Sequence, residues 1–560
     1  MLGRLLTALS TAPPNSGPEE DLMSARETGH VFVVQGDVSQ LAVDAWVLPT
    51  DQFAHIRSKY WGVTGSDRGE RRSEFSEEFR NGRTFAEKLP WNAGLPGIPV
   101  CTAVPARGID SVADLERRLR EGLRVAASIA QERATKGVVP RIATPTFGTG
   151  GGGGGHNVGL FLQGYLDLAE ECARKEGVDV VIACKNSASY HGLQILRCGS
   201  PADCWSTLSN VKRTKAQDLA RMSRSGQLAP FMGSGISVTS GLPDWRALLE
   251  NLRTQQPGLN DIPPENFTKL STLDQADLLA TVMKDGLKQA IADQTIATKM
   301  GLPPLLLAAL PVREAVTLNY DTLFEDARKA QGTPLTVIPV GRAEAGTTWL
   351  LKLHGSTDRQ QDIVLTRQDY LAYASSRSAL SSLATAMLMT RHLIFVGFGF
   401  GDDHFHRLLH DVNTVYARDG QTETATSRRL GTALVLGRDP VRERLWKDSV
   451  DIITFTDGDS PESQGRELEI FLDMLTAHAV ESPTYFLRRE YSAMLTPAEK
   501  LLAEDFERLM LVALAEGVRP SVREAFGQLR RVLGAPDSKT SAFSQWDVVA
   551  ETHPRRCSPG

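Results

Sequence analysis

The sequence predicts an α/β fold in which two layered domains are followed by a helical C-terminal extension. Three observations support this fold class. Short apolar runs of strand length alternate with longer stretches of helical period, glycine-rich segments follow several of these runs, and the segment from residue 481 shows helical period without further strands. At about 100–200 residues per domain, 560 residues leave room for two to four domains.

The first alternating series spans residues 28–200. Apolar runs at 31–34 and 42–48 predict strands, and residues 112–135 have the apolar and charged faces of an amphipathic helix. Residues 1–27, rich in Pro, Ser and Glu, are expected to be a disordered tail. A strand, a helix and a further strand are expected at 138–144, 158–175 and 178–183.

The second alternating series spans residues 213–480 and follows a connector at 200–212. A helix at 215–225 and a short strand at 228–232 precede a glycine-rich loop, and another helix begins at Asp244. Further strands, with helices between most of them, are expected at 313–318, 335–340, 348–353, 362–366, 392–397, 431–436 and 451–455. Residues 481–560 are expected to be a helical extension, because a typical Thr-Pro helix start precedes a stretch of helical period.

The composition limits the classes of protein to which the chain can belong. With 62 Lys and Arg against 67 Asp and Glu, the formal net charge is −5, which gives no general reason to expect nucleic acid binding. No run approaches the roughly 18 apolar residues of a membrane span, and the N-terminus makes a poor secretory signal. None of the six cysteines forms a C-x-x-C pair, which fits a reducing cytosol and argues against a thiolate zinc site. We therefore expect a cytoplasmic protein that does not enter a membrane.

Residues 231–245, FMGSGISVTSGLPDW, are rich in small side chains. Gly233, Gly235 and Gly241 lie between the predicted strand and the helix at Asp244. Glycine lets backbone N–H groups approach a ligand closely, and the N-terminus of a helix attracts phosphate. The loop therefore predicts a cradle for a phosphate or a dinucleotide, although the same residues would also make a tight turn between strand and helix.

Three further predicted strands end in polar or glycine-rich segments. VTLNYD places Thr317, Asn319 and Asp321 after one strand, and KLHGS places His354 after another. A third strand ends in Gly397, Gly399 and Gly401. Because the carboxyl ends of parallel strands meet at one edge of a sheet, these groups are expected to converge on one crevice. Taken singly, Asn319 could cap the helix that follows it, and His354 could be a core histidine.

In this order the four segments resemble the sirtuin family. The family's Gly-Ala-Gly-x-Ser, followed by Gly-Ile-Pro-Asp-Phe-Arg, corresponds to GSGIS and GLPDWR here. Its Thr-x-Asn-x-Asp corresponds to 317–321, and its Leu-His-Gly-Ser to 353–356. The family's later Gly-x-Ser corresponds to 397–399, with Gly399 in the place of the serine. The resemblance covers about 215–480 and implies a Rossmann-like parallel sheet that binds NAD.

The resemblance also implies a role for each matching residue. Asn319 and Asp321 would contact the nicotinamide ribose region or order the water there, and His354 would be the general base. The implied NAD-binding residues are Gly233, Ser234 and Gly235 through their backbone, Ser237, Asp244, Trp245 and Arg246 along the loop over the nicotinamide half, and Thr317, Gly397 and Gly399. Breaking the nicotinamide–ribose bond builds positive charge on the sugar, and a histidine of near-neutral pKa can take a proton from the attacking hydroxyl.

One departure from the family bears on the reaction. Deacylating sirtuins carry two C-x-x-C pairs after the histidine that hold a structural zinc, whereas this chain has only Cys557 after His354. Zinc-lacking sirtuin-like domains in multidomain bacterial proteins resemble NAD hydrolases, many of them antiphage effectors that deplete NAD. We therefore expect an NAD hydrolase without zinc. Its activity would be controlled by the first domain or by assembly into a homo-oligomer, and a partner protein from a defence system would be compatible with the sequence. The alternatives are a non-catalytic nucleotide sensor and a protein deacylase or ADP-ribosyltransferase.

The first domain resembles macrodomains, which bind ADP-ribose. VVQGDVSQLAVDAWV matches the opening of that family, with Asp37 in the place of its adenine-binding aspartate. Gly148, Gly150 and Gly151 lie where the family has a phosphate loop. Leu-Pro-Thr-Asp replaces the family's Asn-Ala-Ala-Asn, so the asparagine that ADP-ribosyl hydrolysis needs is missing. The resemblance implies a macro-like α/β fold and a second site for ADP-ribose or a nucleotide signal; the alternatives are a degenerate domain used for assembly and a flexible glycine run.

Overall fold

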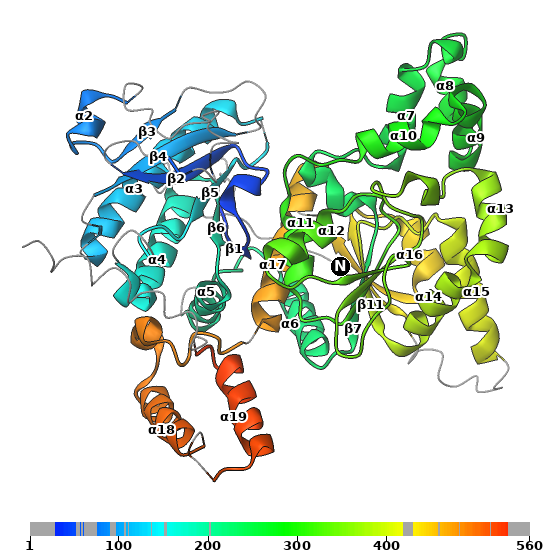
Figure 1. The fold of residues 1–560 in the computed structure, drawn as a ribbon. Helices are drawn as coiled ribbons and strands as arrows, with labels where there is room; N and C mark the ends of the chain where they lie inside the picture. The colour runs from blue at the N-terminus through cyan, green and yellow to red at the C-terminus, as the bar shows by residue number, and fades with distance from the viewer. Residues whose placement is uncertain are drawn as a thin grey trace, which may run out of the picture.

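The chain forms two α/β bodies that lie side by side (Figure 1). Helix α17 (Pro461–Ala479) lies between them, and two C-terminal helices extend from the first body. This computed structural model describes residues 29–51, 56–57, 60, 75–89, 97–105, 108–109, 111–135, 137–149, 154–200, 203–417, 429–456, 460–480, 482–513, 515 and 517–535. The α/β fold class is confirmed, and the tail predicted at 1–27 lies outside the described residues.

The first body is built on a six-stranded sheet of order β1-β6-β5-β2-β4-β3. Its strands are β1 (Val31–Gln35), β2 (Ala45–Asp51), β3 (Ala86–Lys88), β4 (Ile98–Val104), β5 (Arg141–Pro145) and β6 (Asp179–Cys184). All neighbours pair in parallel except β3, which runs antiparallel to β4. Four of these strands were predicted from the sequence, whereas β3 and β4 were not.

Helices α3 (Val112–Arg133), α4 (Val158–Glu176) and α5 (Ser187–Gly199) pack on this sheet. In α3, Leu115, Leu119 and Leu123 recur every fourth residue and are buried, so they form the apolar stripe that contacts the strands. Helix α4 ends at Gly177, whose φ of 64° is the left-handed conformation typical of helix C-termini. The short helices η1 (Val38–Gln40), α2 (Glu77–Arg80) and η4 (Gly154–His156) lie in the connections.

The second body contains a parallel seven-stranded sheet of order β13-β12-β11-β7-β8-β10-β9. Its strands are β7 (Leu228–Met232), β8 (Glu314–Thr317), β9 (Thr336–Ile338), β10 (Trp349–Lys352), β11 (His392–Val396), β12 (Gly431–Leu436) and β13 (Val450–Phe455). Alternate residues of β7 belong to two different apolar clusters, so both faces of the sheet are covered. From β7 the chain proceeds to β8 on one side and later to β11 on the other. That reversal is the point at which open α/β sheets bind ligands, beside the carboxyl ends of β7 and β11.

One predicted strand is wrong. Residues 362–366 belong to neither sheet; the first of them ends the short helix η7 (Gln360–Asp362), and the others follow it. Ile363 and Leu365 are buried, and the N–H of Val364 donates to the carbonyl of His354 at 2.9 Å. The apolar run therefore reflects burial beside the histidine rather than pairing in a sheet.

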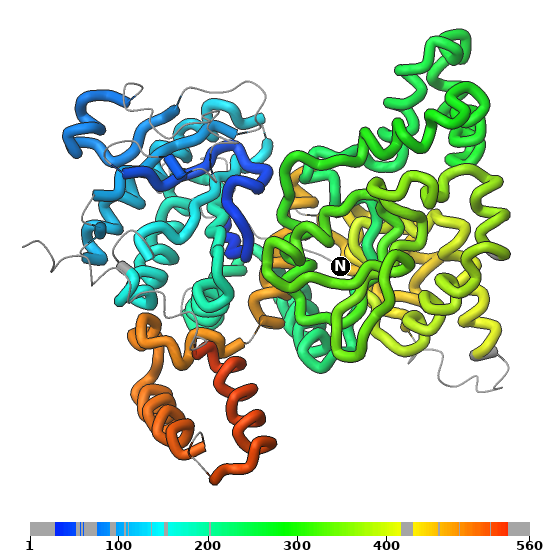
Figure 2. Tube along the Cα trace, viewed as in Figure 1, coloured from blue at the N-terminus to red at the C-terminus, as the bar shows by residue number. Residues whose placement is uncertain are grey.

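Helices fill the connections of the second sheet. Helix α6 (Asn210–Arg224) begins five residues before the predicted start at 215, because Ser209 caps it through the N–H of Lys212. The others are η5 (Ser234–Ser240), α7 (Trp245–Thr254), η6 (Pro257–Leu259), α8 (Pro264–Thr268), α9 (Thr272–Met283), α10 (Gly286–Gln294), α11 (Leu302–Ala309), α12 (Leu323–Ala330), α13 (Arg367–Ser376), α14 (Ser378–Thr390), α15 (Asp403–Ala417) and α16 (Pro440–Trp446). Helices α7 to α10 form a projecting lobe, and the chain returns from it through α11 to the sheet (Figure 2).

Helix α17 connects the two bodies through buried charges. Its Asp473 accepts a hydrogen bond from Arg197 of α5 at 3.1 Å and lies 3.0 Å from Nε2 of His30. Its Arg466 pairs with Asp179, the first residue of β6, at 2.7 Å. The same helix packs on α6 and β12 of the second body. The two bodies therefore share one helix.

The C-terminal extension packs on the first body. It comprises η9 (Arg489–Met494), α18 (Pro497–Ala513) and α19 (Pro520–Val532). Tyr491 Oη lies 2.8 Å from Ser189 Oγ, and Thr484 Oγ1 lies 2.6 Å from His191 Nδ1. The domain boundary at 481 stays a prediction. None of the helices within the described ranges is both long enough and apolar enough to cross a membrane.

Candidate active site

A cavity of about 1540 Å³ opens at the carboxyl edge of the second sheet. The segments that follow four strands line it, beginning at Gly233 after β7, Leu318 after β8, His354 after β10 and Gly397 after β11. The structure therefore brings the sequence-predicted segments together where the strand order reverses. Pockets of about 300–1,000 Å³ hold drug-sized ligands, so this cavity is large enough for a dinucleotide.

The glycines of the first loop let two strand ends pack backbone against backbone. The N–H of Gly233 donates to Val396 O, and the N–H of Gly235 donates to Gly397 O, both at 3.0 Å. A β-carbon on Gly233 would lie 2.4 Å from Gly397 O. These contacts use the N–H groups of both loop glycines. Binding of a pyrophosphate by this loop and Ser234 stays a prediction, and it would rely on N–H groups other than these two.

The polar groups after β8 form a buried network with the same loop. Asn319 Nδ2 donates to Gly233 O at 3.1 Å and to Ser237 Oγ at 3.2 Å. Ser237 Oγ donates to Asp321 Oδ2 at 2.8 Å. Asp321 Oδ1 accepts the N–H of Leu323 at 3.1 Å, so Asp321, not Asn319, binds the first turn of α12. The amide of Asn319 is thus held rigidly at the cavity wall.

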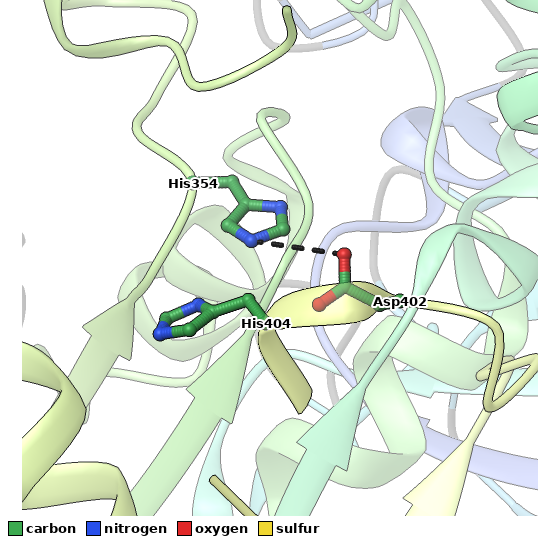
Figure 3. Close-up of side chains that lie close together, drawn as sticks. All are labelled: His354, Asp402 and His404. Atoms are coloured by element: carbon green, nitrogen blue, oxygen red, sulfur yellow. Dashed lines mark ion pairs between the residues drawn. The ribbon is translucent and has the colours of Figure 1, made fainter. Parts of the chain in front are cut away.

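His354 follows β10 and lies in the cavity wall. It is 4% exposed, and its Nε2 has no hydrogen-bond partner among the described residues. Burial lowers the pKa of this imidazole, although the nearby carboxylate of Asp402 acts in the opposite direction. Asp402 Oδ2 lies 3.9 Å from His354 Nε2 (Figure 3). A neutral imidazole with a free nitrogen can accept a proton, as a general base must.

Asp402 and His404 are candidate site residues that were not predicted from the sequence. Both lie where β11 leads into α15, and His404 Nε2 is 2.9 Å from Ser381 Oγ. Burial, together with the nearby His354, lowers the pKa of His404 to about 4. The donor atoms of the two histidines and Asp402 all lie within 4.8 Å of one another, as in groups that hold a metal ion. The sequence signal for them is the run Asp-Asp-His directly after the strand-end glycines.

Lys352 is a further residue that was not predicted. It is 1% exposed and donates to the carbonyls of Tyr320 at 3.2 Å and Asp321 at 2.6 Å. Glu325 Oε1 and Ser356 Oγ each lie 2.9 Å from the same nitrogen, so four acceptors share its three N–H groups. This ammonium group ties the segment after β8 to the segment after β10, so it fixes the catalytic candidates relative to each other.

The remaining predicted residues lie around the cavity in different ways. Asp244 is exposed and caps α7. Trp245 is half-buried and Arg246 is exposed, and both line the cavity. Thr317 donates to the last carbonyl of β7 at 3.3 Å, which joins β8 to β7, and its part in NAD binding stays a prediction. Gly399 is exposed at the cavity rim.

The residues predicted for a second nucleotide site lie in the first body. Asp37 Oδ1 accepts both the N–H and the O–H of Ser39, at 3.0 and 2.8 Å, so its carboxylate caps η1. Gly148 has a φ of 82° and closes a turn after β5. Gly150 and Gly151 lie outside the described residues. Neither Asp37 nor Gly148 is among the described residues that line the cavity, and the second site and the macro-like fold stay predictions.

Comparison with known proteins agrees with this geometry. Residues 313–450 match the SIR2-like domain family. The chain is similar to Defense-associated sirtuin 2 of Bacillus subtilis, with 26% identity over 202 residues, which is 34% of this chain and 20% of that protein. It is also similar to the NAD(+) hydrolase ThsA of Enterococcus faecium, with 28% identity over 214 residues, 37% of this chain and 44% of the relative. For the NAD(+) hydrolase ThsA of Bacillus cereus the identity is 30% over 199 residues, 34% of this chain and 41% of the relative. The similar stretch thus spans less than half the length of each of these relatives.

The family match runs from just before β8 to the start of β13. It includes Asn319, Asp321, His354 and Gly397, four of the residues on which the site prediction depends. Strand β7 and its glycine loop precede the matched residues but complete the same sheet and the same cavity. Residues 313–450 therefore match a SIR2-like domain, and the strand ends within this stretch, together with the end of β7, form the candidate active site.

Proposed function

We propose that this protein is an NAD hydrolase, which cleaves NAD with water to nicotinamide and ADP-ribose. The observation that carries the proposal is the convergence of Asn319, Asp321 and His354 on one cavity of dinucleotide size. The relatives named NAD(+) hydrolase support the same reaction.

In the proposed reaction, the bond between C1′ of the nicotinamide ribose and the ring nitrogen breaks. Its electron pair leaves with nicotinamide, which departs as a neutral ring, and positive charge develops on the sugar. Water bonds to C1′, and His354 Nε2 accepts the proton that is released. In this proposal the amide of Asn319 and the carboxylate of Asp321 orient the ribose or the water. Their hydrogen bonds to Ser237 hold both groups at the cavity wall, which supports this role. Positioning and charge stabilisation in this cavity lower the barrier to cleavage.

Water is proposed as the acceptor rather than an acyl-peptide. The support comes from the sequence, because the two C-x-x-C pairs that follow the histidine in deacylating sirtuins are missing between His354 and Gly560. Those pairs hold the zinc module that helps to form the acyl-peptide cleft. Without that cleft, the solvent is the acceptor with access to C1′.

We further propose that NAD cleavage serves bacterial defence in the cytoplasm, by depleting NAD. A relative named as a defence-associated sirtuin supports this role. Uncontrolled cleavage would poison the host, so an inactive state is needed. Asp44 and Arg141 of the first body line the same cavity, so a structural change in that body would alter the cavity and could control cleavage there. A nucleotide signal or ADP-ribose at the first body, assembly into a homo-oligomer and a partner protein are the controls that we propose.

The test is NAD consumption by the purified full-length chain, with nicotinamide and ADP-ribose quantified. Asn319→Ala and His354→Ala are expected to reduce turnover at least about 100-fold, as for loss of a positioning group or a general base. His410→Ala and Asn413→Ala are matched controls, because both residues are exposed on α15. Wild-type turnover in His354→Ala would refute the assigned base. Release of an O-acyl-ADP-ribose from an acylated peptide would replace hydrolysis by acyl transfer, and NAD binding without cleavage would indicate a sensor.

A further inference from the structure

We propose that His354, His404 and Asp402 bind a divalent transition-metal cation of the Zn²⁺ class, and that the bound cation excludes NAD cleavage. The metal site stands on the three donor groups alone. Its effect on turnover rests on the proposed function, in which His354 is the base.

The three donor groups come from two segments of the chain that meet at the cavity wall. His354 follows β10, whereas Asp402 and His404 lie at the start of α15 (Figure 3). Their donor atoms all lie within 4.8 Å of one another, and His354 Nε2 is 3.9 Å from Asp402 Oδ2. Ligand atoms around a tetrahedral zinc ion with bonds of about 2.1 Å lie about 3.4 Å apart. Side-chain movements of about 1 Å therefore close the site around a cation.

Among the described residues, two buried imidazole nitrogens of this group lack a hydrogen-bond partner. His354 Nε2 and His404 Nδ1 have none among the described residues, and the two side chains belong to residues that are 4% and 7% exposed. Leaving a buried polar atom unpaired costs about 1–3 kcal/mol. A ribose hydroxyl or water in the NAD reaction pairs with His354 but gives no reason for the second unpaired nitrogen. One cation between the two imidazoles satisfies both.

Outer hydrogen bonds orient these groups as they do in metal sites. Ser381 Oγ lies 2.9 Å from His404 Nε2, which leaves Nδ1 for the cation. Tyr370 Oη donates to Asp402 Oδ2 at 2.7 Å, and the N–H of Phe405 donates to Oδ1 at 2.9 Å. Such partners fix the orientation of ligating side chains. Two imidazoles and one carboxylate favour Zn²⁺ and its first-row neighbours over Mg²⁺ or Ca²⁺, which prefer oxygen.

Binding of the cation and cleavage of NAD would then be mutually exclusive. A cation on His354 Nε2 takes the lone pair that accepts the proton in the proposed reaction. Because His354 and Asp402 both line the cavity, the free coordination positions of the cation face the space that NAD needs. The site is an inhibitory one, and it differs from a structural zinc site because its ligands are nitrogen and oxygen rather than thiolates.

The first experiment measures metal binding without NAD. Chelator-treated full-length protein is titrated with Zn²⁺ against a competing chromophoric chelator, and Co²⁺ is added separately to record its visible spectrum. The wild type is expected to bind one Zn²⁺ more per chain than His404→Gln or Asp402→Asn, or to bind it at least about tenfold more tightly. His410→Gln is the matched control on the same helix and is expected to bind like the wild type. The near-isosteric variants keep the local packing, and their melting curves report whether they are folded.

The second experiment adds NAD. Zn²⁺ is expected to abolish turnover by the wild type, and a chelator is expected to restore it. In His404→Gln the Zn²⁺ concentration for half inhibition is expected to rise at least about tenfold, which matches the loss of metal affinity expected in the titration. Equal Zn²⁺ binding by the wild type and both folded variants would overturn the proposal, as would a weak Co²⁺ spectrum of six-coordinate type in the wild type. A protein that binds Zn²⁺ as expected but never cleaves NAD would keep the metal site and refute the proposed function instead.

Discussion

Single residues set the distance between the strand ends that form the cavity, and Gly397 is the clearest case. Its φ is +64°, and a β-carbon there would lie 2.5 Å from the backbone nitrogen of Ile236. A non-glycine residue in this conformation costs about 1–2 kcal/mol before any clash. We expect Gly397→Ala to lower the free energy of unfolding by about 2–4 kcal/mol and to weaken NAD binding, because the glycine loop must move. Chemical denaturation and calorimetry measure both effects.

The control for this prediction is Gly399→Ala. Gly399 lies two residues further along, is exposed, and has no heavy atom within 4 Å of an added β-carbon. Its substitution is expected to change stability by less than about 0.5 kcal/mol. Equal losses of stability in Gly397→Ala and Gly399→Ala would show that the close backbone contact is not the reason for glycine at position 397.

Lys352 allows a second prediction at this scale. Burial raises the pKa of its partner Glu325, although the ammonium group opposes this shift. Removing one member of a buried ion pair leaves an uncompensated charge, so Lys352→Met is expected to lower the free energy of unfolding by about 3–5 kcal/mol. The double variant Lys352→Met/Glu325→Gln is expected to recover part of that loss in urea denaturation. A double variant no more stable than the single one would contradict the charge argument.

The sequence was sufficient to find the residues that follow strands in recognisable order, such as Asn319 and His354. It was not sufficient for Asp402, His404 or Lys352. Their importance depends on which groups surround them in space. A buried lysine has no distinctive sequence pattern, and the run Asp-Asp-His at 402–404 gains its meaning only from the position of His354 beside it. The glycines illustrate the same limit. The contact of Gly233 with the end of β11 has no sequence signal of its own, and the role of this glycine in binding a pyrophosphate stays a prediction.

At the scale of elements, most strands with apolar runs bounded by glycine or polar residues were predictable, and all seven strands of the second sheet were among those expected. The exception is β4, an apolar run after Gly97 that was not predicted. The additional strand at 362–366 shows why such patterns overpredict. Burial alone produces an apolar run, and only the position of neighbouring strands decides whether it pairs. Strand β3 was missed for the opposite reason, since its sequence Ala-Glu-Lys is short and mostly polar and pairs only because β4 lies beside it.

The docking of the C-terminal extension leads to a prediction about pH. His191 of α5 contacts Thr484, and burial lowers its pKa from the usual 6.5 to about 4. The folded chain therefore binds fewer protons than the unfolded chain between these values, and stability falls as the pH drops below about 6.5. Between pH 7 and pH 5, His191 is expected to lower the free energy of unfolding by about 2 kcal/mol. The free energy of unfolding of His191→Gln should therefore fall by about 2 kcal/mol less than that of the wild type over the same interval.

Urea denaturation at the two pH values measures this difference. His156→Gln is the control, because His156 is an exposed histidine in the same body. Identical pH dependence in the wild type, the control and His191→Gln would mean that the docked His191 is not what makes the fold sensitive to acid.

At the scale of the whole molecule, the cavity belongs to both bodies. Its lining includes Asp44 and Arg141 of the first body, and Glu469 of α17, beside the strand ends of the SIR2-like domain. Helix α17 thus holds the first body against the candidate active site. A change that loosens this helix should affect the stability of the first body and the affinity of the cavity together.

Asp473 is the place to test that coupling. It is fully buried and accepts hydrogen bonds from Arg197 at 3.1 Å and from Trp205 Nε1 at 2.8 Å. Burial alone would raise the pKa of this carboxyl, but the charge of Arg197 and the bond to His30 outweigh it and hold the pKa well below its usual range. Asp473→Asn keeps the shape and leaves Arg197 as an unpaired buried cation. The expected loss is about 3–5 kcal/mol in the free energy of unfolding.

Scanning calorimetry with and without NAD measures the result. In Asp473→Asn we expect the unfolding temperatures of the two bodies to lie further apart than in the wild type, because the variant loses the buried ion pair that joins the first body to α17. We also expect weaker NAD binding, since Glu469 lies one turn away on the same helix and lines the cavity. Asp167→Asn, at an exposed position on α4, should change neither quantity. If Asp473→Asn lowered stability but left NAD affinity at the wild-type value, the first body would be a stabilising neighbour of the active site without control over it.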